Sequence, residues 1–179
     1  MCVIFAATTA RLTAAEVIAA NTANRDGIGF AWRGGRGVLW EKGVSIKRAK
    51  RLASSLPLPY LAHFRMATIG GVRPQFCHPF PIDTAGLALQ GRTIAGVLVH
   101  NGHTEGVVPS AVAHGLVNDP TEWTDTRVFA LLAGYRTDIQ KLLNGWSGSF
   151  AVLTPAALYL KGVTAAVRPG MTASNLYWQ

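Results

Sequence analysis

The sequence has little cysteine, few acidic residues and no long apolar run. Its two cysteines, Cys2 and Cys77, cannot form a disulfide framework, and this favours a reducing compartment such as the cytoplasm. No apolar stretch reaches the roughly 18 residues that a transmembrane helix needs, and no basic segment leads into a long apolar core, as it does in a signal peptide. We therefore expect a cytoplasmic protein without a membrane partner.

Metal-ligand patterns are also lacking. The five histidines and two cysteines include neither a C-x-x-C pair nor an H-E-x-x-H motif, so we expect no metal site and no cofactor. What the chain does have is a globular composition, with 49% hydrophobic and 15% charged residues. Its 179 residues suffice to bury a sizeable core, and no repeat or linker divides them. We expect one domain over residues 1–179.

Basic residues outnumber acidic ones by 17 to 9, which gives a formal net charge of +8. Seven of them fall between Arg33 and Arg51, and four lie close together on a predicted helix, in the segment Lys47–Arg51. Such a patch attracts anions, and nucleic acid is one candidate partner. A solvated helix face on a basic protein explains the same residues and is the favoured interpretation, because no nucleic-acid-binding motif accompanies the charge.

Hydrophobic patterning predicts a mixture of strands and helices. Strands are expected over residues 2–7, 28–33, 37–42, 60–64, 94–99, 149–153 and 157–160. Helices are expected over 13–20, from Ser45 to the residues before Pro57, and over 109–116, 125–132 and 137–143. Strands at both ends, hairpins and intervening helices indicate an α+β protein with stacked antiparallel sheets and outer helices.

Cys2 is the most informative residue for function. Removal of Met1 would place a thiol nucleophile and a free α-amine on one residue, and the amine can then act as the base for its own side chain. An α-amine titrates near ~8 and a thiol near ~8.5, so both protons are mobile close to neutral pH. A retained Met1 would acylate this base and block the mechanism.

Four short motifs follow Cys2 in a fixed order. They are His63-Phe64-Arg65-Met66-Ala67-Thr68-Ile69-Gly70, His78-Pro79, His100-Asn101-Gly102 and Thr124-Asp125-Thr126. Together with Cys2 they resemble the class II glutamine amidotransferase domain of the N-terminal-nucleophile hydrolases, from Cys2 to about Leu153. The resemblance implies a four-layer αββα sandwich in which the first strand presents the nucleophile at a cleft between the sheets.

The resemblance also implies a role for each motif. Asn101 and Gly102 would form the oxyanion hole, through the Asn side-chain amide and the Gly N–H. Arg65 would hold the α-carboxylate of glutamine, with the Thr68 hydroxyl beside it, and Asp125 would receive the α-ammonium group. Asp125 could also be the N-terminal cap of its helix. Two further elements would be structural, His63 with His78 in the loop and the turn Asp26-Gly27 near the nucleophile.

Some positions depart from the family pattern. Met66 stands where synthase-type members usually carry Trp, and Arg127 replaces the usual Glu after Thr126, which predicts a more basic pocket edge. We see no second domain to accept ammonia, so ammonia would pass to a separate synthase partner or simply be released. Three functions stay open: a glutaminase or amidotransferase module, a hydrolase of another γ-glutamyl amide, and a non-catalytic binding or assembly protein that reuses the fold.

Overall fold

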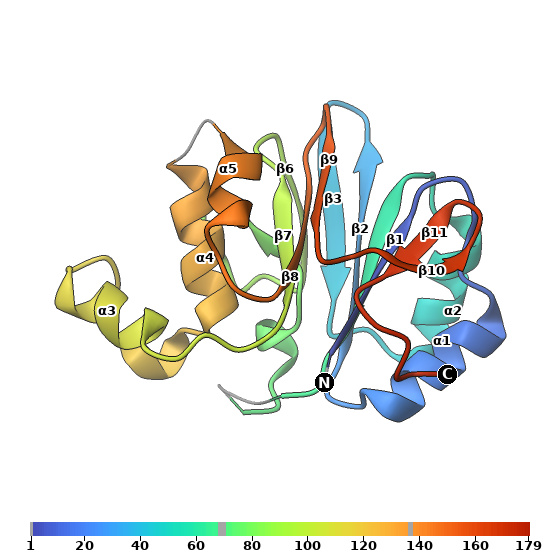
Figure 1. Cartoon of the computed structure of the whole chain (residues 1–179), viewed down its shortest axis with the longest axis horizontal. Coiled ribbons are helices and arrows are strands. Elements are labelled where there is room, and N and C mark those ends of the chain that lie inside the picture. Colours follow the sequence, from blue (N-terminus) through green and yellow to red (C-terminus); the bar gives the residue numbers. More distant parts are fainter. Residues whose placement is uncertain (1, 68–70, 136–137) are drawn as a thin grey trace.

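The computed structural model describes residues 2–67, 71–135 and 138–179, and within them the chain forms two antiparallel sheets (Figure 1). The larger sheet has seven strands in the order β10-β11-β1-β4-β2-β3-β6. In that order they span Ala165–Arg168, Met171–Ala173, Val3–Ala7, Tyr60–Phe64, Ile28–Gly34, Gly37–Lys42 and Gln90–Thr93. The smaller sheet has four strands in the order β5-β7-β8-β9. These span Phe80–Pro81, Val97–Asn101, Ser149–Leu153 and Leu158–Lys161.

Alternation of side chains along β1 lets the larger sheet take part in two cores. The odd-numbered residues of β1 pack with helices α1 (Ala14–Ala23) and α2 (Ile46–Ser55) on the outer face. Ile4 and Ala6 face the smaller sheet, where they meet strands β7 and β8. Cys2 lies two residues before Ile4, and side chains two residues apart along an extended chain point to the same face of a sheet. The Cys2 side chain is therefore on the face between the sheets.

The smaller sheet is covered on its other face by helices α4 (Asp125–Gly134) and α5 (Ile139–Asn144). Leu98 and Phe150 pack against these helices, and α3 (Val107–Ala113) lies beside α4. The layers are therefore helices, sheet, sheet and helices, as Figure 1 shows from one side. Short 3-10 helices at Pro74–Phe76 and Pro120–Glu122 lie in the connections. The predicted α+β architecture with antiparallel sheets and outer helices is confirmed.

Several predicted elements are confirmed closely. The hairpin of β2 and β3, strand β4 and strand β8 lie within a residue of their predicted bounds. The capping box of Thr13 and Glu16 is present at α1, which runs three residues further than expected. Ser45 caps α2 by accepting a hydrogen bond from the Arg48 N–H.

Other predictions are wrong in detail. The strand expected over 94–99 is Val97–Asn101, because Gly96 adopts a φ of +120° and Ile94 is exposed. Helix α3 begins two residues earlier than expected, since Pro109 is tolerated in a first turn. The helix expected over 137–143 is α5, capped by Asp138; Thr137 lies outside the described residues. Strands β5, β6, β10 and β11 are not among the predicted elements.

The missed strands β10 and β11 bring the C-terminal segment back to the first strand. β11 pairs with β1, with Phe5 opposite Ala173. As a result, both ends of the chain lie close together (Figure 1). No helix in the described parts of the chain is long and apolar enough to cross a membrane.

Candidate active site

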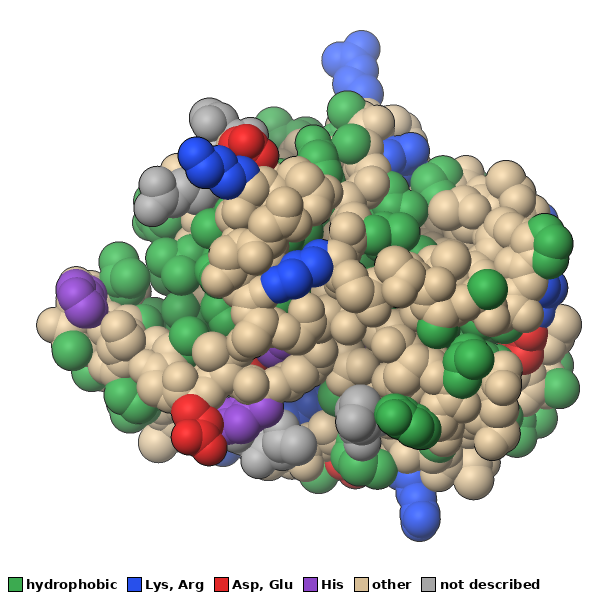
Figure 2. Space-filling view, viewed as in Figure 1, with side chains coloured by type: hydrophobic (Ala, Val, Ile, Leu, Met, Phe, Trp, Pro, Cys, Tyr) green, Lys and Arg blue, Asp and Glu red, His purple; other side chains and the backbone are tan. Residues whose placement is uncertain are grey.

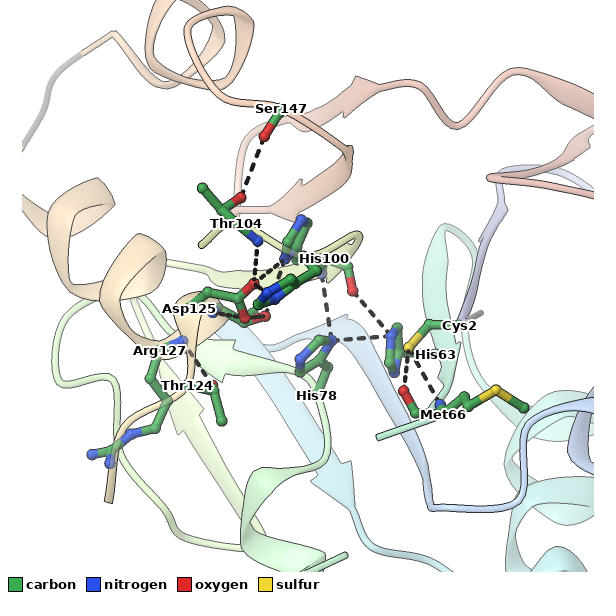
Figure 3. A network of polar contacts seen from close by, with 12 residues as sticks. Cys2, His63, Met66, His78, His100, Thr104, Thr124, Asp125, Arg127 and Ser147 are labelled. Atoms are coloured by element: carbon green, nitrogen blue, oxygen red, sulfur yellow. Dashed lines mark hydrogen bonds and ion pairs between the residues drawn. The ribbon is translucent and has the colours of Figure 1, made fainter. Parts of the chain in front are cut away.

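Cys2 lies immediately before the first residue of β1, beside the end of β4. The register pairs Val3 with Phe64, so Cys2 and the residues after β4 share one edge of the larger sheet. The Cys2 Sγ receives a hydrogen bond from the Met66 N–H and donates one to the Met66 carbonyl oxygen, both at 3.3 Å (Figure 3). Burial raises the pKa of the Cys2 thiol, and the Met66 hydrogen bond and the Arg65 cation oppose this rise only in part. The side chain is therefore a neutral thiol that needs a base.

The turn at Asp26-Gly27 holds the segment after β4 in place. The Asp26 N–H donates to the Arg65 carbonyl at 2.9 Å, and the Arg65 N–H donates to the Gly27 carbonyl at 2.8 Å. The Asp26 carboxylate accepts the Ala67 N–H at 2.7 Å. Gly27 has a φ of +138°, and an added Cβ would lie 2.1 Å from the Cys77 Sγ. The turn therefore lies beside the nucleophile segment, where the resemblance expects it.

Arg65 is buried, and only 4% of it is exposed. One guanidinium nitrogen donates to the Gly71 carbonyl at 2.8 Å, and the side chain lines a cavity together with Cys2. A guanidinium can donate two parallel hydrogen bonds to a carboxylate, so Arg65 suits the recognition of an acidic group there. Thr68, the other predicted carboxylate contact, lies outside the described residues.

Asn101 and Gly102 lie at the end of β7, facing Cys2 across the gap between the sheets. Gly102 has a φ of +154°, and an added Cβ would lie 2.7 Å from the His100 Nε2, so a side chain is excluded there. The Asn101 Nδ2 donates to the Ser174 Oγ at 2.9 Å. Ser174 comes from the segment after β11, and nothing in the predicted motifs pointed to it.

Asp125 is the first residue of α4, and Thr124 is its N-cap, so the prediction of Asp125 as the cap is wrong. The Asp125 carboxylate accepts hydrogen bonds from the Thr126 N–H at 2.7 Å and the Thr104 N–H at 3.1 Å. Its Oδ2 also lies 3.8 Å from Nδ1 of both His100 and His103. The sequence assigned no role to His103, which here borders the carboxylate.

Arg127 does not make the pocket edge more basic, contrary to the sequence-based prediction. Its guanidinium points away from Asp125 (Figure 3) and donates to the Ala85 and Glu122 carbonyls. It also lies 4.0 Å from the centre of the Trp123 ring. Arg127 is thus a buried structural residue of α4.

Two adjoining cavities bring the predicted residues together. A small one of about 30 Å³, room for about one water molecule, is lined in part by Cys2, Arg65, Gly102 and Asp125. A larger one of about 480 Å³ is lined by Cys2, Met66, Asn101, Gly102, His103, Ser149 and Ser174. The five predicted site residues that the structure describes therefore all line one or both of these cavities, which share Cys2 and Gly102.

Three buried histidines lie beneath the site and connect the two sheets (Figure 3). The His100 N–H donates to the His78 Nδ1 at 3.4 Å, so that nitrogen is an acceptor. The His63 Nε2 lies 3.0 Å from the His78 Nδ1 and 3.2 Å from the His100 carbonyl oxygen. Because both of these atoms accept, the proton of His63 is on Nε2. His63 and His78 thus join β4 to β7.

Burial keeps these three imidazoles neutral. It lowers the pKa of His63 to about 3 and that of His100 to about 4, and it holds the pKa of His78 well below its usual range. The hydrogen bonds recorded for the Cys2 Sγ both go to Met66, so the described contacts do not pair the thiol with an imidazole. The arrangement therefore differs from a cysteine–histidine ion pair.

The basic helix α2 lies on the far side of the larger sheet from the cleft. Its Ala49 and Leu52 are buried, Lys47 and Arg51 are exposed, and Arg48 pairs with Glu41 at 2.7 Å. On the face seen in Figure 2, Lys and Arg side chains lie singly rather than in a patch. Nucleic-acid binding through α2 stays a prediction. Among the described residues, no group of three His, Cys, Asp or Glu side chains could hold a metal ion.

Comparison of the sequence with protein-family models and with curated proteins finds no match. The resemblance to class II glutamine amidotransferases therefore depends on the short motifs alone. The function proposed below depends on those motifs and on the geometry of the cleft.

Proposed function

We propose that the protein is a glutamine amide hydrolase of the class II amidotransferase type, built on the N-terminal-nucleophile hydrolase fold. The observation that carries the proposal is the convergence on one cleft of Cys2, Arg65, Asn101, Gly102 and Asp125, which come from four separate segments. A nucleophile, an amide donor, a guanidinium and a carboxylate are the groups needed to bind and cleave a side-chain amide of an amino acid.

The chemistry begins with proton transfer from the thiol. Once Met1 is removed, the Cys2 α-amine takes the Sγ proton, and the thiolate attacks the glutamine carboxamide carbon. The C–N bond breaks as the amine returns the proton to the leaving nitrogen, so ammonia departs and a γ-glutamyl thioester forms. Water then hydrolyses the thioester to glutamate. The raised pKa of the thiol explains why a base is needed, and the described hydrogen bonds of the Cys2 Sγ go to Met66 rather than to an imidazole, which leaves that task to the amine.

Charge that develops on the carbonyl oxygen would meet Asn101 and Gly102. A side-chain amide has two N–H bonds, and Ser174 takes one of them, which leaves the second for the oxyanion. The Gly102 N–H would be the other donor. The donors are uncharged, so they favour the oxyanion without holding a cation beside the thiol.

The substrate would span both cavities. Its amide would lie at Cys2 in the larger cavity, and its α-carboxylate and α-ammonium would reach Arg65 and Asp125 in the smaller one. Because the smaller cavity has room for about one water molecule, it must widen when an amino-acid head group binds. Ammonia would then be released to water or to a separate synthase.

A second substrate class is favoured by the size of the larger cavity. Ammonia needs almost no space, yet about 480 Å³ adjoins Cys2 on the side of Asn101 and Ser149. A group attached to the amide nitrogen could occupy this volume, so a substituted γ-glutamyl amide is the alternative substrate. Turnover of glutamine and of γ-glutamyl anilides by one preparation would separate the two.

The test of the proposed function is the intact mass of the protein before and after incubation with a diazoketone analogue of glutamine. We expect loss of Met1 and one covalent adduct, with glutamine protecting against it. The Cys2→Ala variant should gain no adduct, whereas Cys77→Ala, which removes a thiol that is only 1% exposed, should gain the same adduct as the wild type. An intact Met1 with no adduct would contradict the proposal and favour a binding or assembly protein.

A further inference from the structure

The segment after β11 contacts both the nucleophile strand and the predicted oxyanion donor. Four hydrogen bonds converge on Ser174. Its Oγ accepts from the Ile4 N–H at 3.0 Å, from the Asn101 Nδ2 at 2.9 Å and, more weakly, from the Asn175 Nδ2 at 3.5 Å. The Ser174 N–H donates to the Ile4 carbonyl at 2.9 Å. One hydroxyl thus ties β1 of the larger sheet to β7 of the smaller sheet.

The hydrogen-bonding capacity of the Ser174 hydroxyl determines how the Asn101 amide is oriented. A serine oxygen has two lone pairs, and its two short hydrogen bonds come from Ile4 and Asn101, while the Asn175 Nδ2 lies at the longer distance of 3.5 Å. The Asn101 side chain rotates about single bonds, so a fixed acceptor on one of its two N–H groups also fixes where the other points. Asn101 is only 7% exposed, and Ser174 lines the larger cavity beside it and Cys2.

The neighbouring Asn175 contacts the backbone of Cys2, the proposed nucleophile. Its Nδ2 donates to the Cys2 carbonyl oxygen at 2.8 Å, which holds the backbone of the nucleophile. Two consecutive residues therefore position the attacking atom and the amide that faces it. This segment is remote in sequence from every predicted motif.

We propose that Ser174 is a positioning residue that orients the Asn101 amide toward the oxyanion, an inference that rests on the proposed glutamine hydrolysis. Its hydroxyl accepts one N–H of Asn101 and so aims the second N–H at the carbonyl oxygen of the bound amide. The effect belongs to the transition state, because the oxyanion exists only there.

The test compares Ser174→Thr with Ser174→Val in protein whose mass shows that Met1 is removed. The two side chains have nearly the same shape, and only threonine keeps the hydroxyl. For Ser174→Val we expect kcat for glutamine to fall about 10- to 100-fold with KM within about twofold, less than the roughly 100- to 1,000-fold cost of deleting an oxyanion donor. Ser174→Thr should keep kcat within about threefold of the wild type.

A double-mutant cycle separates orientation from general loosening. In an Asn101→Ala background, Ser174→Val should lower kcat no further, because the group that it orients is gone. Thr8→Val is the matched control, since the Thr8 hydroxyl also ties the end of β1 to the C-terminal hairpin, at the Gly170 carbonyl, but away from the cleft. It should leave kcat unchanged.

Each outcome has one meaning. Equal kcat values for the threonine and valine variants, or an additive loss in the Asn101→Ala background, would overturn the role of Ser174 while glutamine hydrolysis by the wild type stands. A wild type that neither hydrolyses glutamine nor reacts with the diazoketone would overturn the proposed function, and the role of Ser174 with it.

Discussion

The two walls of the cleft are built in different ways. The wall that carries the proposed nucleophile, the nucleophile wall, is made of Cys2, Arg65 and Met66. It is held mainly by main-chain hydrogen bonds, those of the β1–β4 ladder and of Gly27 with Arg65, and the Cys2 Sγ adds two hydrogen bonds with the Met66 backbone. The aspartate wall, made of His100 to Gly102 and Thr124 to Thr126, depends more on side chains. Asn101 is fixed by Ser174, and the Asp125 carboxylate accepts from Thr104 and Thr126.

This difference separates the tasks of the walls. Main-chain pairing fixes positions without regard to side-chain identity, so the nucleophile wall can place a thiol and a guanidinium on a rigid edge. Side-chain hydrogen bonds are easily lost by substitution, and they concentrate at the Asn101 amide and the Asp125 carboxylate, the groups that the proposed function assigns to the oxyanion and the α-ammonium. We therefore expect the aspartate wall to be the more sensitive of the two to substitution.

Gly102→Ala should have the largest effect. Its new Cβ would lie 2.7 Å from the His100 Nε2, and the φ of +154° is one that L side chains rarely adopt. The Gly102 N–H would move away from the oxyanion, so we expect kcat for glutamine to fall roughly 100- to 1,000-fold. The control is Gly106→Ala, a glycine with positive φ and open space around its Cβ position. Equal losses for the two variants would contradict a role for Gly102 in the cleft.

Asp125→Asn should raise KM for glutamine about 10- to 100-fold, because a hydrogen bond to a charged group contributes about 1.5–3 kcal/mol. The loss should fall on KM more than on kcat, since the α-ammonium is bound in both the ground state and the transition state. The control is Asp119→Asn, a change at the exposed N-cap of a 3-10 helix. Steady-state kinetics of the two variants give the comparison. An unchanged KM for Asp125→Asn would remove this residue from the site.

The sequence predicts the local contacts of the cleft better than its long-range contacts, for a physical reason. Strand β4 and the turn at Asp26-Gly27 follow from local patterns, alternation and turn residues, that short segments carry in themselves. Ser174 and Asn175 act through partners some 70 to 170 positions away, and no local pattern records such a pairing. Strands β10 and β11 were missed because they are short, with four and three residues, and carry little alternation in themselves.

Asp26→Ala tests the nucleophile wall and should have a smaller effect. It leaves the Ala67 N–H without its 2.7 Å acceptor while the β1–β4 ladder remains. We expect KM for glutamine to rise about 3- to 10-fold, consistent with an unmade hydrogen bond of about 1–3 kcal/mol partly relieved by water. Asp26→Asn keeps an acceptor oxygen and should stay near the wild type. A fall in kcat/KM as large as that of Gly102→Ala would contradict the proposed difference between the walls.

The histidine cluster joins the two walls, because His63 belongs to β4, His100 belongs to β7, and His78 contacts both. The cluster is neutral in the folded protein, and His78 lies in the loop between the two strands that carry His63 and His100. Protonation of an imidazole there would place a buried cation beside other donors. The packing of the two walls against each other should therefore depend on pH.

Stability against urea should fall as the solution is acidified from pH 7 toward pH 4. An unfolded histidine titrates near ~6.5, whereas burial lowers the pKa of His63 to about 3 and of His100 to about 4 in the folded protein. Between these values the unfolded chain binds more protons, so the stabilisation present above the unfolded pKa is lost progressively as pH falls. Each such histidine can add about 1.4 kcal/mol per pH unit to the slope.

His78→Asn should make this pH dependence shallower. The asparagine oxygen can replace the acceptor Nδ1, which receives the His100 N–H, but it does not titrate. We expect lower stability at pH 7, from lost packing, together with a smaller loss between pH 6.5 and pH 4. His114→Asn, at an exposed position on the far end of α3, should retain the wild-type slope. Equal slopes of stability against pH for all three proteins would show that protonation of the buried cluster does not determine the acid sensitivity of the fold.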